Sequence, residues 1–148
     1  MASTTVLKIV VDTNVIVAAL IRAGIVREIL LRHPGAFLTP ATCMEETWEK
    51  RGEWNRRAMD ERTIREAWDL LAKRVLVVVP RSVLHAKEAE AARLIRDPDD
   101  VPVVALALSL ANEGIWTFNT KDFAGRELVA CVRVLTTGEV KSLLEGSG

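Results

Sequence analysis

The sequence lacks most features that mark a specialised class of protein. Only two of the 148 residues are cysteine and two are histidine, and 20 basic residues balance 20 acidic ones, so the formal net charge is zero. Two cysteines cannot build a disulfide framework, and the histidines lack metal-ligand spacing. Because no global positive charge attracts nucleic acid, such a partner would require a local basic surface or a bound metal.

Long apolar runs and short catalytic signatures are missing as well. No hydrophobic stretch approaches the roughly 18 residues of a membrane-spanning helix, and no signal peptide is visible. Glycine-rich phosphate loops, nucleophile elbows and zinc signatures are absent. We therefore expect a cytoplasmic protein with no membrane partner, whose thiols Cys43 and Cys131 are buried and free.

The chain has the size and composition of one globular domain, with 49% hydrophobic and 27% charged residues, which argues against disorder. We expect a single domain over residues 1–148. Strands are predicted at residues 7–11, 36–39, 75–79, 115–118 and 132–135. Helices are predicted at residues 15–21, 25–31, 41–51, 53–74, 84–95, 101–110 and 139–144. This alternation predicts an α/β fold, with helices on both faces of a mainly parallel sheet.

Acidic residues recur where the predicted strands end, which in parallel sheets is the edge that carries function. They are Asp12 after the first strand, Glu45 and Glu46 after the second, Asp97, Asp99 and Asp100 before the helix at 101–110, and Asp122 after the fourth. The same rule draws attention to the threonines at two of these ends, Thr39 and Thr117.

Each acid also has an ordinary explanation. Asp12 can cap the following helix, Glu45 and Glu46 can face solvent, and Asp97, Asp99 and Asp100 can begin a helix. Asp122 can belong to a turn. If the strand ends converge, however, the carboxylates repel one another unless a divalent cation such as Mg²⁺ neutralises them. Two such ions could catalyse phosphodiester hydrolysis.

Three ordered segments resemble the PIN domain family. Residues 11–20 (VDTNVIVAAL) look like its first motif and residues 97–108 (DPDDVPVVALAL) like its third. Residues 116–123 (WTFNTKDF) are similar to the Thr-x-Asn-x-x-Asp-Phe segment of VapC-type toxins. Their order and spacing agree over residues 8–135. The resemblance implies a PIN-like three-layer α/β/α fold with about five strands and Mg²⁺- or Mn²⁺-dependent nuclease chemistry.

The resemblance also implies roles for individual residues. Asp12, Asp100 and Asp122 match the first, third and fourth metal-ligating acids of the family. Thr13 and Asn14 match polar residues that support the first acid, and Asn119 matches one near the fourth, beside Thr117 at the end of the predicted strand. These residues are the candidate catalytic and supporting groups.

The second acid is a choice between adjacent glutamates. The family carries a glutamate on the helix after the second strand, and the comparison favours Glu46, with Glu45 as the alternative. Helical periodicity leaves the two nearly even, because adjacent residues point about 100° apart and both lie off the apolar stripe of Met44 and Trp48. The sequence departs from the family at Thr47, where an apolar residue is usual.

The leading hypothesis is an endoribonuclease that hydrolyses RNA, the toxin of a toxin–antitoxin pair, with an antitoxin protein as a further partner. A non-catalytic scaffold that binds RNA or protein and a DNA-directed nuclease are the alternatives. PIN domains that resemble this chain commonly pair, so we expect a homodimer that uses residues 25–31 or the tryptophan-bearing helices.

One basic segment offers a surface for RNA. It carries Arg51, Arg56, Arg57, Arg62 and Arg65 among acidic residues, so it is either a solvated helix face or a contact surface for the RNA backbone. Neighbouring tryptophans can stack on bases, although packing in the core or across a dimer is the simpler role.

Overall fold

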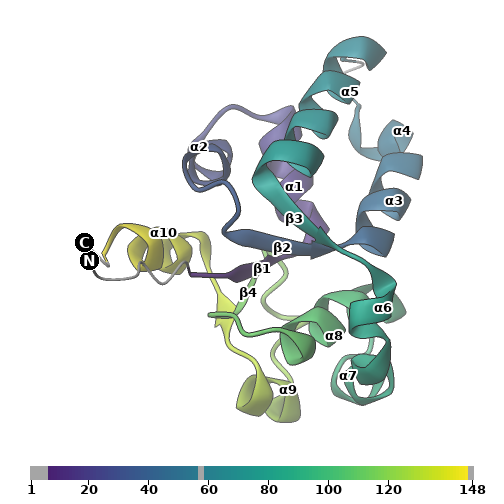
Figure 1. Ribbon diagram of the computed structural model, residues 1–148, viewed down its shortest axis with the longest axis vertical. Helices are drawn as coiled ribbons and strands as arrows, with labels where there is room; N and C mark the ends of the chain where they lie inside the picture. The colour runs from purple at the N-terminus through teal and green to yellow at the C-terminus, as the bar shows by residue number, and fades with distance from the viewer. Residues whose placement is uncertain (1–6, 57–58, 147–148) are drawn as a thin grey trace.

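One parallel sheet lies between two layers of helices (Figure 1). The computed structural model describes residues 7–56 and 59–146, and its strand order is β3-β2-β1-β4-β5 with every neighbouring pair parallel. The strands are β1 (Ile9–Val11), β2 (Phe37–Pro40), β3 (Leu76–Val79), β4 (Ile115–Trp116) and β5 (Val134–Leu135). The predicted α/β/α fold with a parallel five-stranded sheet is confirmed.

The central strand β1 explains the apolar run at the start of the sequence. Ile9, Val10 and Val11 are fully buried, because β1 has a strand on each side and helices over both faces. Val10 pairs with Leu38 of β2 and Ile115 of β4, so the three central strands end at nearly the same level. That common carboxyl edge positions the candidate site.

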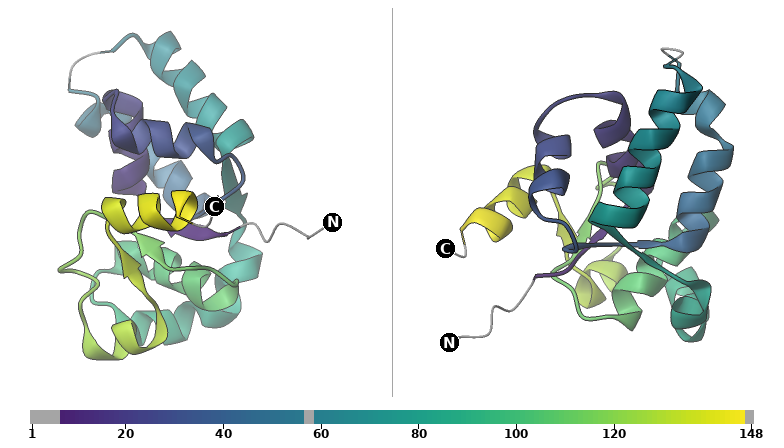
Figure 2. Two further views of the ribbon diagram at one scale, coloured as in Figure 1. Left: turned by 90° about the vertical axis from the view of Figure 1, so that its left-hand side faces the viewer. Right: turned by 45° about the horizontal axis from the view of Figure 1, so that its top comes forward.

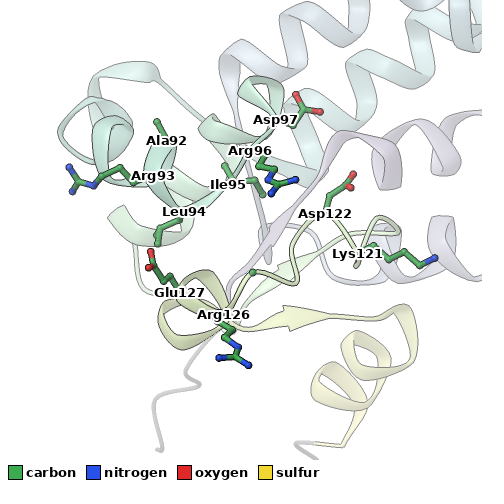
Figure 3. Close-up of a pocket in the computed structure, with 11 residues that line it drawn as sticks. Ala92, Arg93, Leu94, Ile95, Arg96, Asp97, Lys121, Asp122, Arg126 and Glu127 are labelled. Carbon is green, nitrogen blue, oxygen red and sulfur yellow. The ribbon is translucent and has the colours of Figure 1, made fainter.

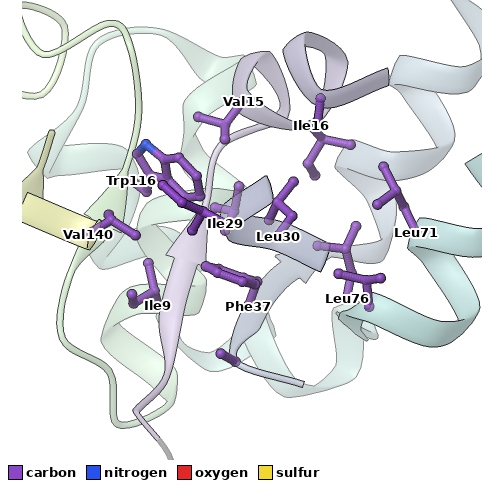
Figure 4. Close-up of a cluster of buried hydrophobic side chains, with 14 of the residues drawn as sticks. Ile9, Val15, Ile16, Ile29, Leu30, Phe37, Leu71, Leu76, Trp116 and Val140 are labelled. Carbon is purple, nitrogen blue, oxygen red and sulfur yellow. The ribbon is translucent and has the colours of Figure 1, made fainter. Parts of the chain in front are cut away.

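One helical layer covers the face of the sheet that carries Ile9, Phe37 and Trp116 (Figure 4). The aromatic rings of Phe37 and Trp116 have centroids 5.8 Å apart, and Val140 closes the cluster from the C-terminal helix. The helices of this layer are α1 (Thr13–Ile21), α2 (Ile25–Arg32), α5 (Glu61–Leu70) and α10 (Thr137–Glu145), with α3 (Ala41–Glu49) and α4 (Arg51–Trp54) beside them.

The second layer covers the opposite face of the sheet (Figure 2). Val10, Leu38 and Ile115 belong to the core cluster on this face. Its apolar centre is α8, whose Val104 and Leu106 are fully buried. The helices are α6 (Arg81–Leu84), α7 (Glu88–Leu94), α8 (Val101–Ser109) and α9 (Arg126–Cys131). No helix in residues 7–56 or 59–146 combines the length and apolar character needed to cross a bilayer.

Three predictions about local structure were wrong. The helix expected at 53–74 is divided into α4, α5 and a π-helical turn at Leu71–Val75. The short helix α9 was missed, and Cys131, expected to be buried, is exposed at its end, whereas Cys43 is buried as predicted. Arg57, one of the five arginines considered as an RNA surface, lies outside the described residues.

Gly114 holds a backbone position that other residues cannot occupy without strain. Its φ is +145°, and a Cβ built there would lie 2.6 Å from the Arg133 carbonyl oxygen. The Gly114 carbonyl accepts a hydrogen bond from the Val10 N–H (2.9 Å), and the Ile115 N–H donates to the Arg133 carbonyl (2.8 Å). The absence of a side chain at Gly114 therefore allows the backbone to approach Arg133 closely enough for β4 to pair with both β1 and β5.

Candidate functional site

Asp12 lies at the end of β1 and is 5% exposed. One carboxylate oxygen, Oδ1, accepts the Thr13 N–H at 2.8 Å, so Asp12 caps α1. The other, Oδ2, accepts the hydroxyl of Thr117 at 2.8 Å. Asp12 is therefore both the cap of α1 and a buried acid at the sheet edge.

Thr117 connects Asp12 to the end of β4, 105 residues further along the chain. It is 1% exposed, and its hydroxyl oxygen accepts the backbone N–H of Asn119 at 3.0 Å. The two strand ends meet because Val11 pairs with Trp116 in the β1–β4 register. Asn119 thus supports Asp12 indirectly, through Thr117.

Further acids surround Asp12. Burial raises the pKa of Asp12, hydrogen bonds from Thr117 and Thr13 oppose that increase, and the charges of Asp122 and Asp97 add to it. Two strand ends and the turn before α8 therefore converge on a single acidic cluster.

Asp100 is the most strongly perturbed acid of the cluster. Its pKa is raised to about 7, first by burial and then by the negative charges of Asp12, Asp97, Asp122 and Asp99. A carboxyl group with this pKa is only partly ionised at neutral pH. A cation at the site would favour its ionised form.

Asp97 joins the cluster although the sequence interpretation did not select it as a ligand. Its side chain accepts the Asp99 N–H at 2.9 Å and caps the 3₁₀ turn Pro98–Asp100. This capping role was visible in the sequence. It is a sufficient explanation of Asp97 by itself, so the place of Asp97 in the acidic cluster was not recognised. Its place three residues before Asp100 was the available signal, because one tight turn separates the two residues.

The two adjacent glutamates of α3 lie on different sides of the helix. The thiol of Cys43 has its pKa raised to about 12, first by burial and then by the charges of Asp12, Glu46 and Asp100. Glu46 is therefore near the same thiol as two acids of the cluster. Glu45 instead lines an apolar hollow of about 220 Å³ with Trp48 and Trp68.

The donor atoms at this edge are suited to a hard divalent cation, because the acidic cluster offers only carboxylate oxygens. Two further buried oxygens, Asn14 Oδ1 and Thr39 Oγ1, have no hydrogen-bond partner in the described structure. Within residues 7–56 and 59–146, no three His, Cys, Asp or Glu side chains are already close enough to enclose an ion. Two of the acids that the sequence selected, Glu46 and Asp122, are exposed.

A groove of about 800 Å³ lies beside these acids (Figure 3). One wall is formed by residues 92–97 at the end of α7, and the other by residues 121–122 and 125–127 around the start of α9. Asp97 and Asp122 belong to these walls. A ligand in the groove would therefore contact the acidic cluster.

The tryptophans pack against one another. Trp68 lies with its ring centroid 5.2 Å from that of Trp48 and 6.3 Å from that of Trp54, and Trp54 Nε1 donates to the Thr47 carbonyl at 2.9 Å. These contacts hold α3, α4 and α5 together. The packing role expected for the tryptophans is confirmed.

Fold and site together define an α/β/α domain with an acidic pocket at the carboxyl edge of a parallel sheet. A family model of the PIN domain matches residues 10–144. The chain therefore belongs to the PIN domain family, whose members are generally nucleases that use divalent metals and act on nucleic acid. No curated protein matches the chain.

Proposed function

We propose that this PIN domain is a Mg²⁺- or Mn²⁺-dependent endoribonuclease that hydrolyses RNA phosphodiester bonds. The supporting observation is the buried carboxylate of Asp12 among Asp97, Asp100 and Asp122. None of these four acids forms an ion pair with a lysine, arginine or histidine of the described residues. Acids kept together without a compensating charge are costly to the fold, and a ligand gives the arrangement a purpose.

In this proposal, Asp12, Glu46, Asp100 and Asp122 hold the metal. When bound, the ion supplies an activated water and neutralises charge on the phosphate. The hydrogen bonds from Thr13 and Thr117 fix the orientation of Asp12, so this ligand is preorganised.

The other residues of the site have narrower tasks. Asn119 fixes the hydroxyl of Thr117 through its backbone, and Asn14 contributes a buried oxygen near Asp12. Asp97 adds a fifth acid, and Glu45 lies outside the site. A bound cation would favour the ionised form of Asp100, so the affinity for the ion would depend on pH.

A direct test compares single-stranded RNA and DNA of one sequence with the purified chain. We expect Mn²⁺-dependent cleavage of the RNA within the strand, abolished by EDTA and restored by excess Mn²⁺. Preferential cleavage of the DNA would make the protein a DNA-directed nuclease. Metal-independent binding without cleavage of either strand would make it a scaffold.

The toxin role is part of the same proposal and places the enzyme in the cytoplasm with its RNA substrate. Expression of the wild-type chain in a bacterium should arrest growth, whereas expression of the Asp12→Asn chain should not. Co-expression of its antitoxin, expected from a neighbouring gene, should restore growth. Growth that is equal with both chains would contradict the toxin role.

We also propose that the chain forms a homodimer. Ile25 and Leu31 of α2 are each 45% exposed and Leu70 of α5 is 48% exposed, so apolar area is available on one layer. Light scattering should give about twice the chain mass of 16.4 kDa at micromolar concentration. A mass equal to that of one chain would refute the dimer.

A further inference from the structure

The groove beside the acidic cluster carries cations on both walls. Arg93 and Arg96 extend from one wall, and Lys121 and Arg126 extend from the other (Figure 3). All four side chains are exposed, and none forms an ion pair or donates a hydrogen bond to another described residue. The four charges are therefore available to a ligand.

The arginines of α4 and α5 differ in this respect. Arg51 forms an ion pair with Glu61 at 2.8 Å and Arg62 forms one with Glu66 at 3.3 Å. The guanidinium of Arg65 lies 5.7 Å from the ring centroid of Trp48. These charges already have partners, so the basic segment that stood out in the sequence is less available than the groove.

Acids are also present in the groove, but two of the three belong to the acidic cluster. Asp97 and Asp122 lie together in Figure 3, whereas Glu127 lies near Leu94, away from them. The groove therefore has an acidic end that can take a cation and basic side chains along both walls. A ligand that fits both parts carries repeated negative charges and can share one of them with a metal ion.

We infer that this groove binds the phosphate backbone of one nucleic-acid strand and places one phosphate at the acidic cluster. The inference rests on the proposed nuclease function and specifies the path of its substrate. It also reconciles nucleic-acid binding with the zero net charge of the chain, because local cations supply the attraction that the whole molecule lacks. The strand follows α7 and the start of α9 and does not cross α4 and α5.

The first test measures how salt weakens binding. A fluorescein-labelled 12-nucleotide single-stranded RNA is titrated with the protein in EDTA, where cleavage is prevented, and anisotropy is recorded. Each phosphate contact contributes about −0.7 to the slope of log K against log salt concentration for a single strand. Four contacts therefore predict a slope of about −2.8, or about 50-fold weaker binding between 50 and 200 mM salt.

The matched variants remove charge without removing length. The double variant Arg93→Gln, Arg126→Gln takes one cation from each wall, and its slope should fall to about −1.4, or about 7-fold over the same salt range. Arg62→Gln removes one charge that already has a partner and should leave the slope unchanged. Equal slopes for the parent and the double variant would overturn the inference, as would a larger effect of Arg62→Gln.

A second measurement separates the groove from the acidic cluster. Bis(p-nitrophenyl) phosphate is a small diester that can reach the cluster without following the groove. In Mn²⁺ the double variant should hydrolyse it as fast as the parent does, while its cleavage of RNA at low substrate concentration falls at least tenfold. Equal losses on both substrates would overturn the inference, because the two arginines would then act on the reaction at the cluster and not on the path of the strand.

The outcome for the groove does not depend on catalysis. If the parent hydrolyses neither the small diester nor RNA, the proposed function fails, and the anisotropy titration still decides whether the groove binds the strand. Single-stranded DNA of the same sequence should show the same change of slope, because phosphate contacts carry no information on the sugar. If the double variant instead loses affinity only for a polyglutamate peptide, the groove binds an acidic protein segment and the inference is wrong.

Discussion

The pKa values of carboxyl groups at the sheet edge and on the helical surface of this protein are shifted in opposite directions. Hydrogen bonding to Arg81 lowers the pKa of Glu88, and hydrogen bonding to the Thr136 backbone lowers that of Glu139. The pKa values of Asp12 and Asp100 are raised, in both cases first by burial. The hydrogen bonds to the surface acids thus outweigh the effect of burial on the pKa, whereas at Asp12 burial outweighs the hydrogen bonds from Thr117 and Thr13.

This contrast separates acids that serve the fold from acids that serve a ligand in the proposed function. Glu139 belongs to a capping box at the start of α10: its carboxylate accepts the Thr136 N–H at 3.0 Å, and its own N–H donates to the Thr136 hydroxyl oxygen at 3.2 Å. Asp12 also caps a helix, yet its neighbours Asp97 and Asp122 disfavour its charge. Capping alone therefore does not explain the acidic cluster, whereas the cation of the proposed function would neutralise its repulsion.

The largest expected effect is on catalysis. Asp12→Asn removes a charged ligand while keeping the size of the side chain, so RNA cleavage in Mn²⁺ should fall at least a hundredfold, or about 2.7 kcal/mol in barrier. Glu139→Gln, the same change at a surface acid, should leave cleavage unchanged. Initial rates on one RNA substrate make the comparison, and equal rates for the two variants would remove Asp12 from the site.

The next effect concerns the two glutamates of α3. Glu46→Gln should weaken Mn²⁺ binding about tenfold, which corresponds to about 1.4 kcal/mol. Glu45→Gln should change it little, because Glu45 lies beside Trp48 and Trp68. Titration calorimetry with Mn²⁺ and RNA cleavage at one ionic strength provide the measurements. The reverse ranking would make Glu45 the ligand, and two silent variants would exclude α3 from the site.

The pH dependence of stability should also separate the two groups of acids. Asp100 has a pKa of about 7 in the folded chain against an ordinary value of 3.8, so the folded state binds more protons between these pH values. Its contribution to stability therefore falls as pH rises from about 4 to about 7. Glu88 and Glu139, with lowered pKa values, contribute in the opposite direction at acidic pH.

Urea unfolding in EDTA at pH 5 and pH 7.5 measures this difference. The wild-type chain should lose more stability between the two pH values than Asp100→Asn, which has no carboxyl group to titrate. Saturating Mn²⁺ should reduce the loss, because the ion stabilises the folded state that binds it. An equal pH dependence in the two proteins would show that Asp100 titrates normally.

Much of the fold could be predicted because buried parallel strands appear as short apolar runs. Residues 7–11 and 75–79 show this clearly, and each strand was placed within two residues of its observed ends. The errors have local causes. Charged residues at 53–74 concealed a break between α4 and α5, and the six residues of α9 are too few to show helical periodicity.

The acidic cluster was predictable where one rule sufficed and not where distant residues had to meet. Asp12 and Asp122 follow strands, so the strand-end rule selected them. Asp97 already had a capping role and was set aside. The hydrogen bond from Thr117 to Asp12 depends on the register of β1 and β4, which no local pattern in the sequence reveals.

The smallest expected effect is on the melting temperature in metal-free buffer. It compares an acid of the sheet edge, Asp12, with an acid of the helical surface, Glu139. Asp12→Asn keeps both local hydrogen bonds, because the amide oxygen can accept the Thr13 N–H and the amide nitrogen can donate to Thr117. It removes one charge from a repelling cluster, so the melting temperature should hold or rise slightly. Glu139→Gln keeps the capping box but removes a charge that favours the start of α10, costing about 0.3–1 kcal/mol.

For a domain of this size that cost corresponds to a decrease of about 1–4 °C in melting temperature, measurable by scanning calorimetry in EDTA. Asp12→Ala serves as the control, because it removes the cap of α1 and leaves Thr117 without its acceptor, and should be less stable than Asp12→Asn by about 1–2 kcal/mol. If Asp12→Asn were as destabilised as Asp12→Ala, the charge of Asp12 would stabilise the metal-free fold. Asp12 would then belong with Glu88 and Glu139, among the acids that serve the fold.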